Sequence, residues 1–208
     1  MRLFLLAGVF PVLLVACSAS SGADGAVISG TFAGQTPAAA DSAAFSGASA
    51  NGAFFSELIT STAGACTTAQ HYANKANSSR LELVIQSYGP SSPLTIPPGT
   101  YAITNGDPAD DTNGTSLEVS ADYNALDATC SPTIAGTTSV AVSGTITIAS
   151  VSDAEIVGSF ALTFPSGDHL SGDFRSPVCS AAASLAPTPP QAGGSDAPDT
   201  ATTQACEP

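Results

Sequence analysis

Apolar and polar residues alternate most clearly between residues 139 and 175 of the chain. Three successive segments show this two-residue period, which is typical of a strand with one buried face: Ser139–Ala149, Ile156–Phe164 and Asp168–Arg175. Short turns separate them, so the pattern predicts an antiparallel meander. The positions expected to face inward are Val140, Val142, Ile146, Ile148, Ile156, Phe160, Leu162, Phe164, Leu170 and Phe174.

Three glycines recur in the inward phase of this meander: Gly144, Gly158 and Gly172. Glycine inside a strand often marks a bend, a bulge or a place where two backbones approach closely. We therefore expect a curved sheet that closes over a core at these positions.

Upstream, Arg80–Tyr88 and Ser116–Asn124 alternate in the same way. Weaker strand patterns cover Val27–Phe32, Phe54–Ser61 and Gly99–Thr104, and Ala65–Ala76 has the composition of a short helix. The chain is therefore predicted to be all-β, an antiparallel β-sandwich or barrel-like meander of about eight or nine strands with at most one short helix.

The first residues have a different pattern, because Leu3–Ala16 is almost uniformly apolar. Such a run is too short to cross a hydrocarbon core of about 30 Å, and it is typical of an export signal. It ends in Leu14-Val15-Ala16-Cys17, which resembles the lipobox of bacterial lipoproteins. The resemblance implies cleavage before Cys17, a diacylglycerol on its thiol and acylation of the new amine, for example with palmitate. Ser18, in the family pattern, favours the outer membrane.

These observations divide the chain into four parts. Residues 1–16 are predicted to be the signal peptide and residues 17–26 a lipidated, flexible leader. Residues 27–182 form the predicted β domain, and residues 183–208, rich in Pro, Ala and Thr, are expected to be a disordered tail.

The charge of the chain is strongly one-sided, with 17 acidic and four basic residues and a formal net charge of −13. Removal of residues 1–16 would leave Lys75, Arg80 and Arg175 as the basic residues. A surface of this kind repels phosphate backbones, which excludes nucleic acid as a partner class.

Four cysteines follow Cys17, and an even number in an exported chain favours two disulfides. If the strands from Arg80 to Arg175 succeed one another in one antiparallel meander, the residues before the first and after the sixth strand share one end. This places Cys66 near Cys179 and leaves Cys130 for Cys206, since bridged Cα atoms lie within about 7 Å. The absence of a Cys-x-x-Cys pair in the sequence argues against a zinc ribbon or a thioredoxin-like centre.

One acidic segment offers oxygen ligands of the kind that calcium takes, namely Asp107, Asp110, Asp111 and Asn113. Aligned with the EF-hand loop, however, Ala109 and Ser120 fall at the first and twelfth places, where acids belong. The sequence favours a solvated turn over a calcium site, and we expect no cofactor.

The chain has two histidines. His169 lies next to Asp168 on the outward phase of a predicted strand, but no Gly-x-Ser-x-Gly motif accompanies it. His71 follows Cys66 at a spacing that would suit two metal ligands, although a zinc site needs more. Tyr88 is the one evident platform for a sugar ring, and the chain has no Trp.

These patterns favour a non-enzymatic, lipid-anchored protein of the cell envelope with a structural or interaction role. Two alternatives stay open: a calcium-dependent adhesion module that uses the Asp107–Asn113 loop, and a hydrolase whose site is scattered over several loops.

Overall fold

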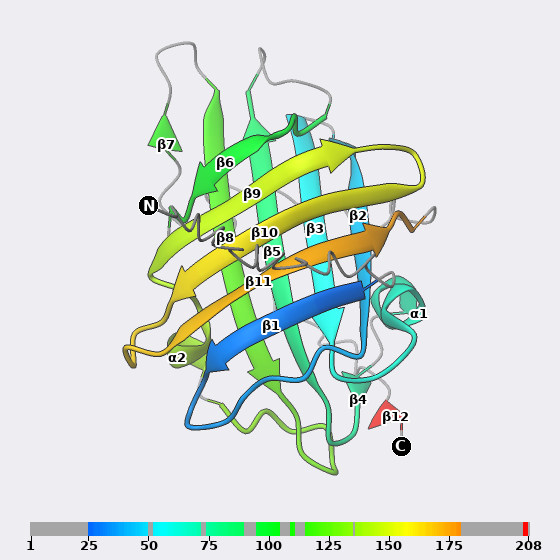
Figure 1. Ribbon diagram of the computed structural model, residues 1–208, viewed down its shortest axis with the longest axis vertical. Helices are drawn as coiled ribbons and strands as arrows, with labels where there is room; N and C mark the ends of the chain where they lie inside the picture. The colour runs from blue at the N-terminus through cyan, green and yellow to red at the C-terminus, as the bar shows by residue number, and fades with distance from the viewer. Residues whose placement is uncertain are drawn as a thin grey trace, which may run out of the picture.

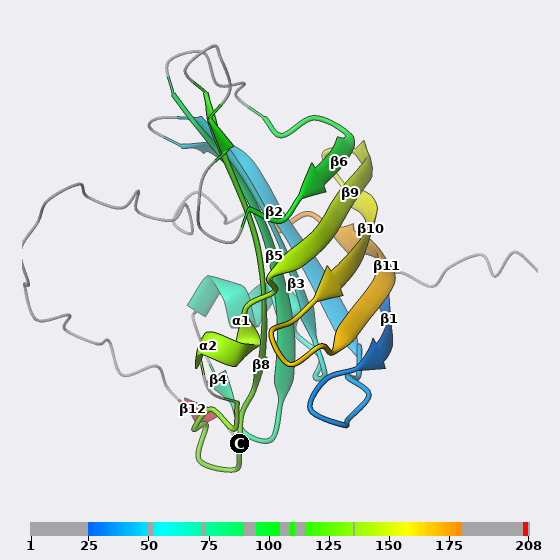
Figure 2. The ribbon, with the colours of Figure 1, turned by 90° about the vertical axis from the view of Figure 1, so that its left-hand side faces the viewer.

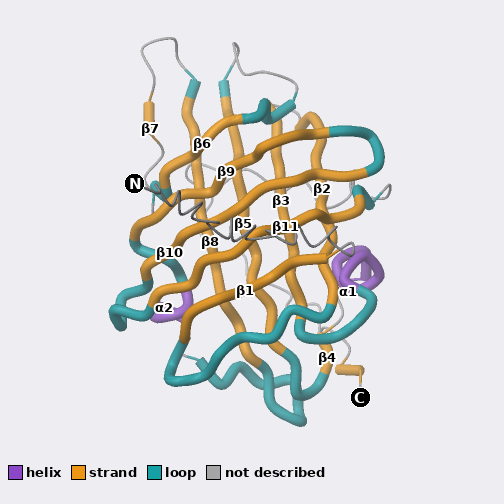
Figure 3. The backbone as a smooth tube through the Cα atoms, in the orientation of Figure 1, coloured by secondary structure: helices purple, strands orange, loops and turns teal. Residues whose placement is uncertain are grey.

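The computed structural model describes residues 25–49, 52–71, 74–89, 95–104, 109–110, 115–134, 136–179 and 206–207. Two five-stranded antiparallel sheets make up most of this part of the chain (Figures 1 and 3). The β10 sheet has the order β1 (Gly25–Thr31), β11 (His169–Pro177), β10 (Glu155–Thr163), β9 (Ser143–Val151) and β6 (Gly99–Ala102). The β5 sheet has the order β2 (Asp41–Ser49), β3 (Gly52–Thr60), β5 (Ser79–Tyr88), β8 (Ser116–Ala125) and β7 (Ala109–Asp110).

The two sheets pack face to face, with the strands of the β10 sheet running obliquely across those of the β5 sheet (Figures 1 and 2). This is the all-β sandwich expected from the alternation of the sequence. The smaller elements are α1 (Ala65–His71), the single turn α2 (Gly136–Ser139) and a two-residue parallel ladder of β4 (Asn74–Lys75) with β12 (Cys206–Glu207). Figure 2 shows α1, β4 and β12 on the outer side of the β5 sheet.

The core between the sheets contains the inward rows that the alternation predicts. Leu81, Leu83 and Ile85 of β5 are fully buried, and they face Ile156, Phe160 and Leu162 of β10 across one hydrophobic cluster. Phe32 packs edge-on against Phe164, with ring centroids 4.7 Å apart, and against Tyr123 at 4.8 Å. Burial of a large apolar side chain contributes roughly 1.5–3 kcal/mol to stability, so this cluster is the main source of folding free energy.

The predicted meander of β9, β10 and β11 is present, but its first strand begins later than expected. Residues 136–139 form α2, and Ala141 N–H donates to Ala121 of β8 before β9 begins at Ser143. The phase is therefore broken ahead of Gly144: Val142 is 40% exposed and Ser139 is buried, opposite to the prediction. The change comes from tertiary contacts, because residues 140 and 141 pair with β8 of the β5 sheet before the chain enters β9.

The inward glycines lie where backbones and rings approach closely. Gly158 faces Phe174 and Gly172 faces Phe160 in the β10–β11 register. A Cβ on Gly158 would collide with the Phe174 ring and the Thr147 carbonyl, and one on Gly172 with the Val27 carbonyl. A register shift between Val157 and Gly158 adds a bulge, so the predicted curvature and close approach are both found.

The order of strands upstream differs from a simple meander. β5 pairs directly with β8 along its whole length, and β6, which lies between them in sequence, pairs with β9 in the other sheet. Pro97 and Pro98 have no N–H to donate and cannot continue a ladder beside β5. Ile96 is buried in the core just before them, so the chain crosses from one sheet to the other there.

Several expectations on boundaries change or lie outside the described residues. Gly25 and Ala26 belong to β1 rather than to a leader, and β2 has no counterpart among the predicted strands. Residues 1–16, Cys17 and most of the predicted tail lie outside the described part of the chain.

Candidate functional site

The first of the two disulfides joins α1 to the segment after β11. Cys66 and Cys179 have Cα atoms 5.9 Å apart, and Cys179 is 3% exposed. Its N–H donates to the Ala44 carbonyl, because the chain leaves β11 and runs beside β2 at the edge of the other sheet. The bridge therefore holds α1 against the outer face of β2 and β3.

The second disulfide joins Cys130, in the loop after β8, to Cys206 of β12, with Cα atoms 5.7 Å apart. The same region carries the β4–β12 ladder, in which Cys206 faces Asn74. These are the two pairs predicted from the sequence. The assumption that the six strands follow one another in a single meander was wrong. Because β8 pairs directly with β5, Cys130 lies at the end where β5 begins, and not at the opposite end.

The acidic segment is only partly covered by the structure. Asp110 ends the two-residue strand β7 and faces Ser116 of β8. Asp107, Asp111 and Asn113 lie outside the described residues. Within the described residues, no group of three or more His, Cys, Asp or Glu side chains is placed to hold a metal ion. The prediction on calcium stays untested.

His169 is exposed on β11, and its Nδ1 lies 3.0 Å from the Thr163 hydroxyl. The neighbouring Asp168 carboxylate accepts hydrogen bonds from the Ser166 hydroxyl at 2.7 Å and from Ala33 N–H at 3.0 Å. Those bonds, the Ser166 one first, lower the pKa of Asp168. The acid thus stabilises its own turn and makes no hydrogen bond to the imidazole. His71 ends α1, and its side chain is outside the described set.

Tyr88 lies at the end of β5 on the outer face, as its phase predicts. Its hydroxyl hydrogen-bonds to Gln86 and, at 3.3 Å, to Glu118. Burial, with a smaller contribution from the charge of Glu118, raises the pKa of Tyr88 to about 12. The phenol is therefore a neutral hydrogen-bond donor tied to its own sheet.

The core contains a buried acid that the alternation of the sequence did not lead us to expect. Glu57 of β3 is fully buried between the sheets, where it accepts a hydrogen bond from Ser176 of β11. Ser176 is also hydrogen-bonded to Ser42 of β2 at 2.7 Å, while Glu57 Oε2 has no partner. Burial raises the pKa of Glu57 well above its usual value of 4.5, so the carboxyl is neutral over a wider pH range than an exposed one.

A signal for Glu57 was present in the sequence. Phe55, Glu57 and Ile59 share one phase of β3, and both apolar members of that row are buried between the sheets. The phase alone would have placed the carboxylate in the core. The sealed position leaves it no route to an external substrate, and its hydrogen bonds tie together β2, β3 and β11.

A small open pocket, with about 10 Å³ of enclosed space, lies where α1, β4 and the adjoining ends of β3, β5 and β8 meet. Two basic side chains, Lys75 and Arg80, line it together with hydroxyl and amide groups. The other lining residues are Thr60, Thr62, Thr68, Asn74, Ser78, Ser79 and Leu126. We call this the basal pocket. No single stretch of sequence contains it, because its residues come from four elements, β3, α1, β4 and β5, and from adjoining loops.

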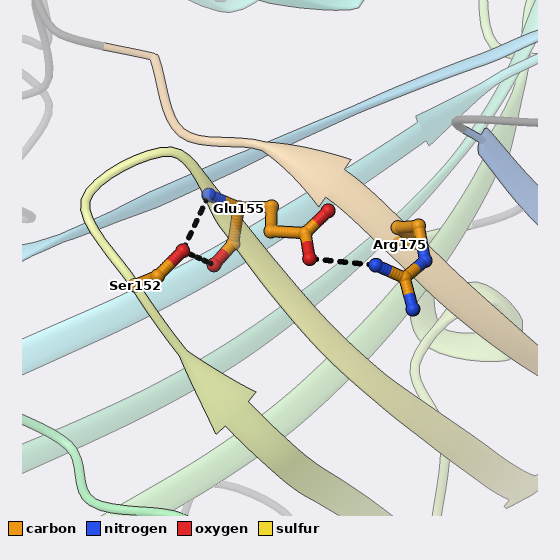
Figure 4. Close-up of polar contacts among 3 residues, drawn as sticks. All are labelled: Ser152, Glu155 and Arg175. Atoms are coloured by element: carbon orange, nitrogen blue, oxygen red, sulfur yellow. Dashed lines mark hydrogen bonds and ion pairs between the residues drawn. The ribbon is translucent and has the colours of Figure 1, made fainter.

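Among the described side chains, no acid forms an ion pair with Lys75 or Arg80 of the basal pocket. Lys75 Nζ donates to the Ala63 carbonyl at 2.5 Å, and Arg80 Nε is buried with no hydrogen-bond partner. By contrast, Arg175 on the β10 sheet forms an ion pair with Glu155 at 2.6 Å, and Ser152 braces the backbone of that glutamate (Figure 4). In the described part of the chain, that is the one ion pair between an Arg or Lys and an acid.

Comparison of the chain with protein-family models, with curated proteins and with solved structures finds no match. Among the described residues, no helix has the length and apolar character needed to cross a membrane.

Proposed function

We propose that this chain is a lipid-anchored protein of the bacterial cell envelope, attached through Cys17, whose β-sandwich has a structural or interaction role. The observation that carries the anchoring is the sequence Leu14-Val15-Ala16-Cys17 at the end of the apolar run. More than one acyl chain on one cysteine gives stable membrane attachment, whereas a single chain is marginal.

The disulfides support an exported location. The two bridges Cys66–Cys179 and Cys130–Cys206 use every cysteine after Cys17. Structural disulfides persist in oxidising compartments such as the periplasm or the cell surface. Cys17 is then the one cysteine left for modification, which fits the role proposed for it.

The chemistry of the described side chains supports interaction rather than catalysis. Glu57 and its two serines are sealed in the core, and His169 contacts a threonine rather than an activated nucleophile. The basal pocket offers hydrogen-bond donors and positive charge, which suit binding.

Metabolic labelling with a fatty acid tests the anchor. The wild-type chain, expressed in a bacterium, is expected to incorporate labelled palmitate and to fractionate with the outer membrane. Cys17→Ala is expected to lose the label completely, because the acceptor thiol is gone. Cys66→Ala is the matched control, since it removes a cysteine but leaves the lipobox unchanged. Label retained in Cys17→Ala would rule out the proposal.

The sorting step has its own test. Ser18→Asp keeps the lipidated cysteine and changes only the residue that follows it. In the family pattern, aspartate at this place favours the inner membrane, so the variant is expected to keep its label and move to the inner-membrane fraction. Unchanged fractionation would contradict the outer-membrane assignment and leave the anchor itself in place.

A further inference from the structure

Arg80 is the starting point, because the Nε atom of its guanidinium is buried without an acceptor. Arginine stays charged and carries five N–H donors in a planar fork that matches an oxyanion. Buried polar groups are nearly always hydrogen-bonded, and each exception needs an explanation. Arg80 Nε is buried without a partner although the chain has 17 acidic residues, and no acid is among the described residues that line the basal pocket.

From this and the composition of the pocket walls, we propose that the basal pocket binds one small oxyanion group, with Arg80 as its principal ligand and Lys75 as the second. The pocket collects two of the four basic residues of the chain. The hydroxyl of Thr68 lines it as well and can donate to an oxygen atom, whereas those of Thr60 and Ser78 already donate to the Thr62 and Lys75 carbonyls. The enclosed space is only about 10 Å³, so one small group could bind at the open mouth of the pocket, and a large ligand could not enter it.

Both disulfides brace the walls of this pocket. Thr68 lies in α1, which Cys66 bonds to Cys179. Asn74 and Lys75 form β4, which pairs with β12, and Cys206 of β12 is bonded to Cys130. Cys130 Sγ lies 3.6 Å from the Asn74 carbonyl. Rigid walls reduce the entropy lost when a ligand is ordered, so two short elements that would be weak alone can present donors in fixed positions.

Two carboxylates of the chain itself are the rival partners. Asp122 of β8 lies two residues before Asn124, which faces Arg80, and its Oδ1 also lacks a partner. Glu207 faces Lys75 in the β4–β12 ladder. If either carboxylate were the intended partner, its removal would weaken the protein and no external anion would be needed. If the pocket is built for an external anion, Asp122→Asn and Glu207→Gln leave binding unchanged or strengthen it.

Titration of the purified full-length chain decides between these readings. The probes are inorganic phosphate, sulfate and acetate, each against chloride at equal ionic strength, with calorimetry and melting temperature as readouts. We expect saturable binding of at least one oxyanion and a melting temperature that rises with its concentration, because a ligand of the native state stabilises it. Phosphate against acetate distinguishes a tetrahedral from a planar group, and glycerol 3-phosphate against phosphate distinguishes a lipid headgroup from a free ion.

The variants locate the site. Arg80→Gln is expected to weaken binding at least about tenfold, since a charge-assisted bidentate contact is lost, and Lys75→Gln less. Arg175→Gln is the matched control, because it removes an equal charge from the other sheet. If Arg80→Gln does not fold, Lys75→Gln and Thr68→Val carry the same test. The proposal is overturned if no oxyanion binds at about 50 mM, if all pocket variants bind like wild type, or if Arg175→Gln weakens binding as much as they do.

This inference goes beyond the proposed anchoring and does not depend on it. Lipid labelling reports on residue 17 alone, and anion titration reports on the basal pocket alone. Either can therefore fail without affecting the other.

Discussion

The two sheets of the sandwich differ in how many of their faces are covered. β10 alternates between buried and partly exposed residues, which is the pattern of a sheet with one open face. β3 is buried at eight of its nine positions. Its outer residues Phe54 and Leu58 belong to a second, smaller cluster formed with β2, α1 and Cys179. A strand between two apolar layers loses its alternation, so the same fold contains strands that look quite different in sequence.

The cover on the β5 sheet is too small to be stable alone. α1 has seven residues, and helices shorter than about 12 residues are marginal in water. The Asp41 carboxylate of β2 accepts hydrogen bonds from the backbone N–H groups of Gly64 and Ala65, at 2.7 and 2.9 Å. The Cys66–Cys179 disulfide holds the first turn of α1 in place. The difference between the sheets thus rests on one cap and one disulfide.

The largest expected effect comes from removing that cover. Cys66→Ala with Cys179→Ala is expected to lower the free energy of unfolding by about 3–5 kcal/mol, through lost loop-closure entropy and a cavity around the buried Cys179. Urea denaturation measures it. Cys130→Ala with Cys206→Ala is the control, because it leaves α1 and the second cluster in place and should cost less. Equal losses would mean that the cover of α1 adds nothing.

The next effect tests the close approach inside the β10 sheet. Gly158→Ala is expected to cost about 2–3 kcal/mol, because its methyl group would overlap the Phe174 ring and the Thr147 carbonyl. Gly99→Ala in β6 is the control, since its added Cβ would lie at an ordinary 3.5 Å from the Tyr101 ring. Thermal unfolding of both variants decides the matter, and a similar melting temperature for the two would contradict the packing argument.

The pH dependence of stability tests Glu57, the acid buried between the two sheets. The pKa of Glu57 is raised by burial, so the unfolded chain loses this proton near pH 4.5 and the folded protein keeps it. The contribution of Glu57 to stability is therefore constant below pH 4.5 and falls as pH rises toward the folded pKa, by at most about 1.4 kcal/mol per pH unit.

Glu57→Gln removes this dependence while it keeps an acceptor for Ser176. We expect the variant to match or exceed the stability of wild type at pH 7 and to show a flatter pH profile above pH 4.5. Glu155→Gln, on the exposed surface, is the control and should leave the slope as it is. A Glu57→Gln profile parallel to that of wild type would show that Glu57 is not the cause.

The smallest expected effect is at the edge of the β5 sheet. We predict that millimolar calcium does not change the melting temperature. In an alignment with the EF-hand loop, Ala109 and Ser120 occupy the first and twelfth places, where acidic ligands are needed. Asp111→Ala should likewise leave the melting temperature unchanged, with and without calcium. A calcium-dependent rise that disappears in Asp111→Ala would show that the loop binds calcium, as the adhesion alternative requires.

The comparison of the sheets also explains what the sequence could predict. Alternation identified β5, β8, β10 and β11 because each separates a core from water. β2 was missed because Ala43 and Ala44 are both buried, one under α1 and one between the sheets, and small residues on both faces give no period. The crossing of β6 to the other sheet depends on tertiary packing around Ile96, which no local pattern records.

The candidate site was less predictable than the fold. The disulfide pairs were predicted from which strand ends should lie close together. The pairs are confirmed, although Cys130 lies at the end where β5 begins and not at the opposite end, where it was expected. The basal pocket had no motif, because Thr68, Lys75 and Arg80 come from three different elements. The sequence offers only an indirect indication. The chain has four basic residues, and two of them, Lys75 and Arg80, lie five residues apart.

The order of the disulfides has a consequence for cleavage of the backbone. Along the chain the bonded cysteines alternate, since Cys130 falls between Cys66 and Cys179, and Cys206 falls beyond both. The two covalent loops therefore overlap rather than nest or follow one another. A protease that cuts once anywhere between Cys66 and Cys206 leaves both fragments joined, because at least one bridge spans every such cut. A molecule nicked there would therefore stay in one covalent piece.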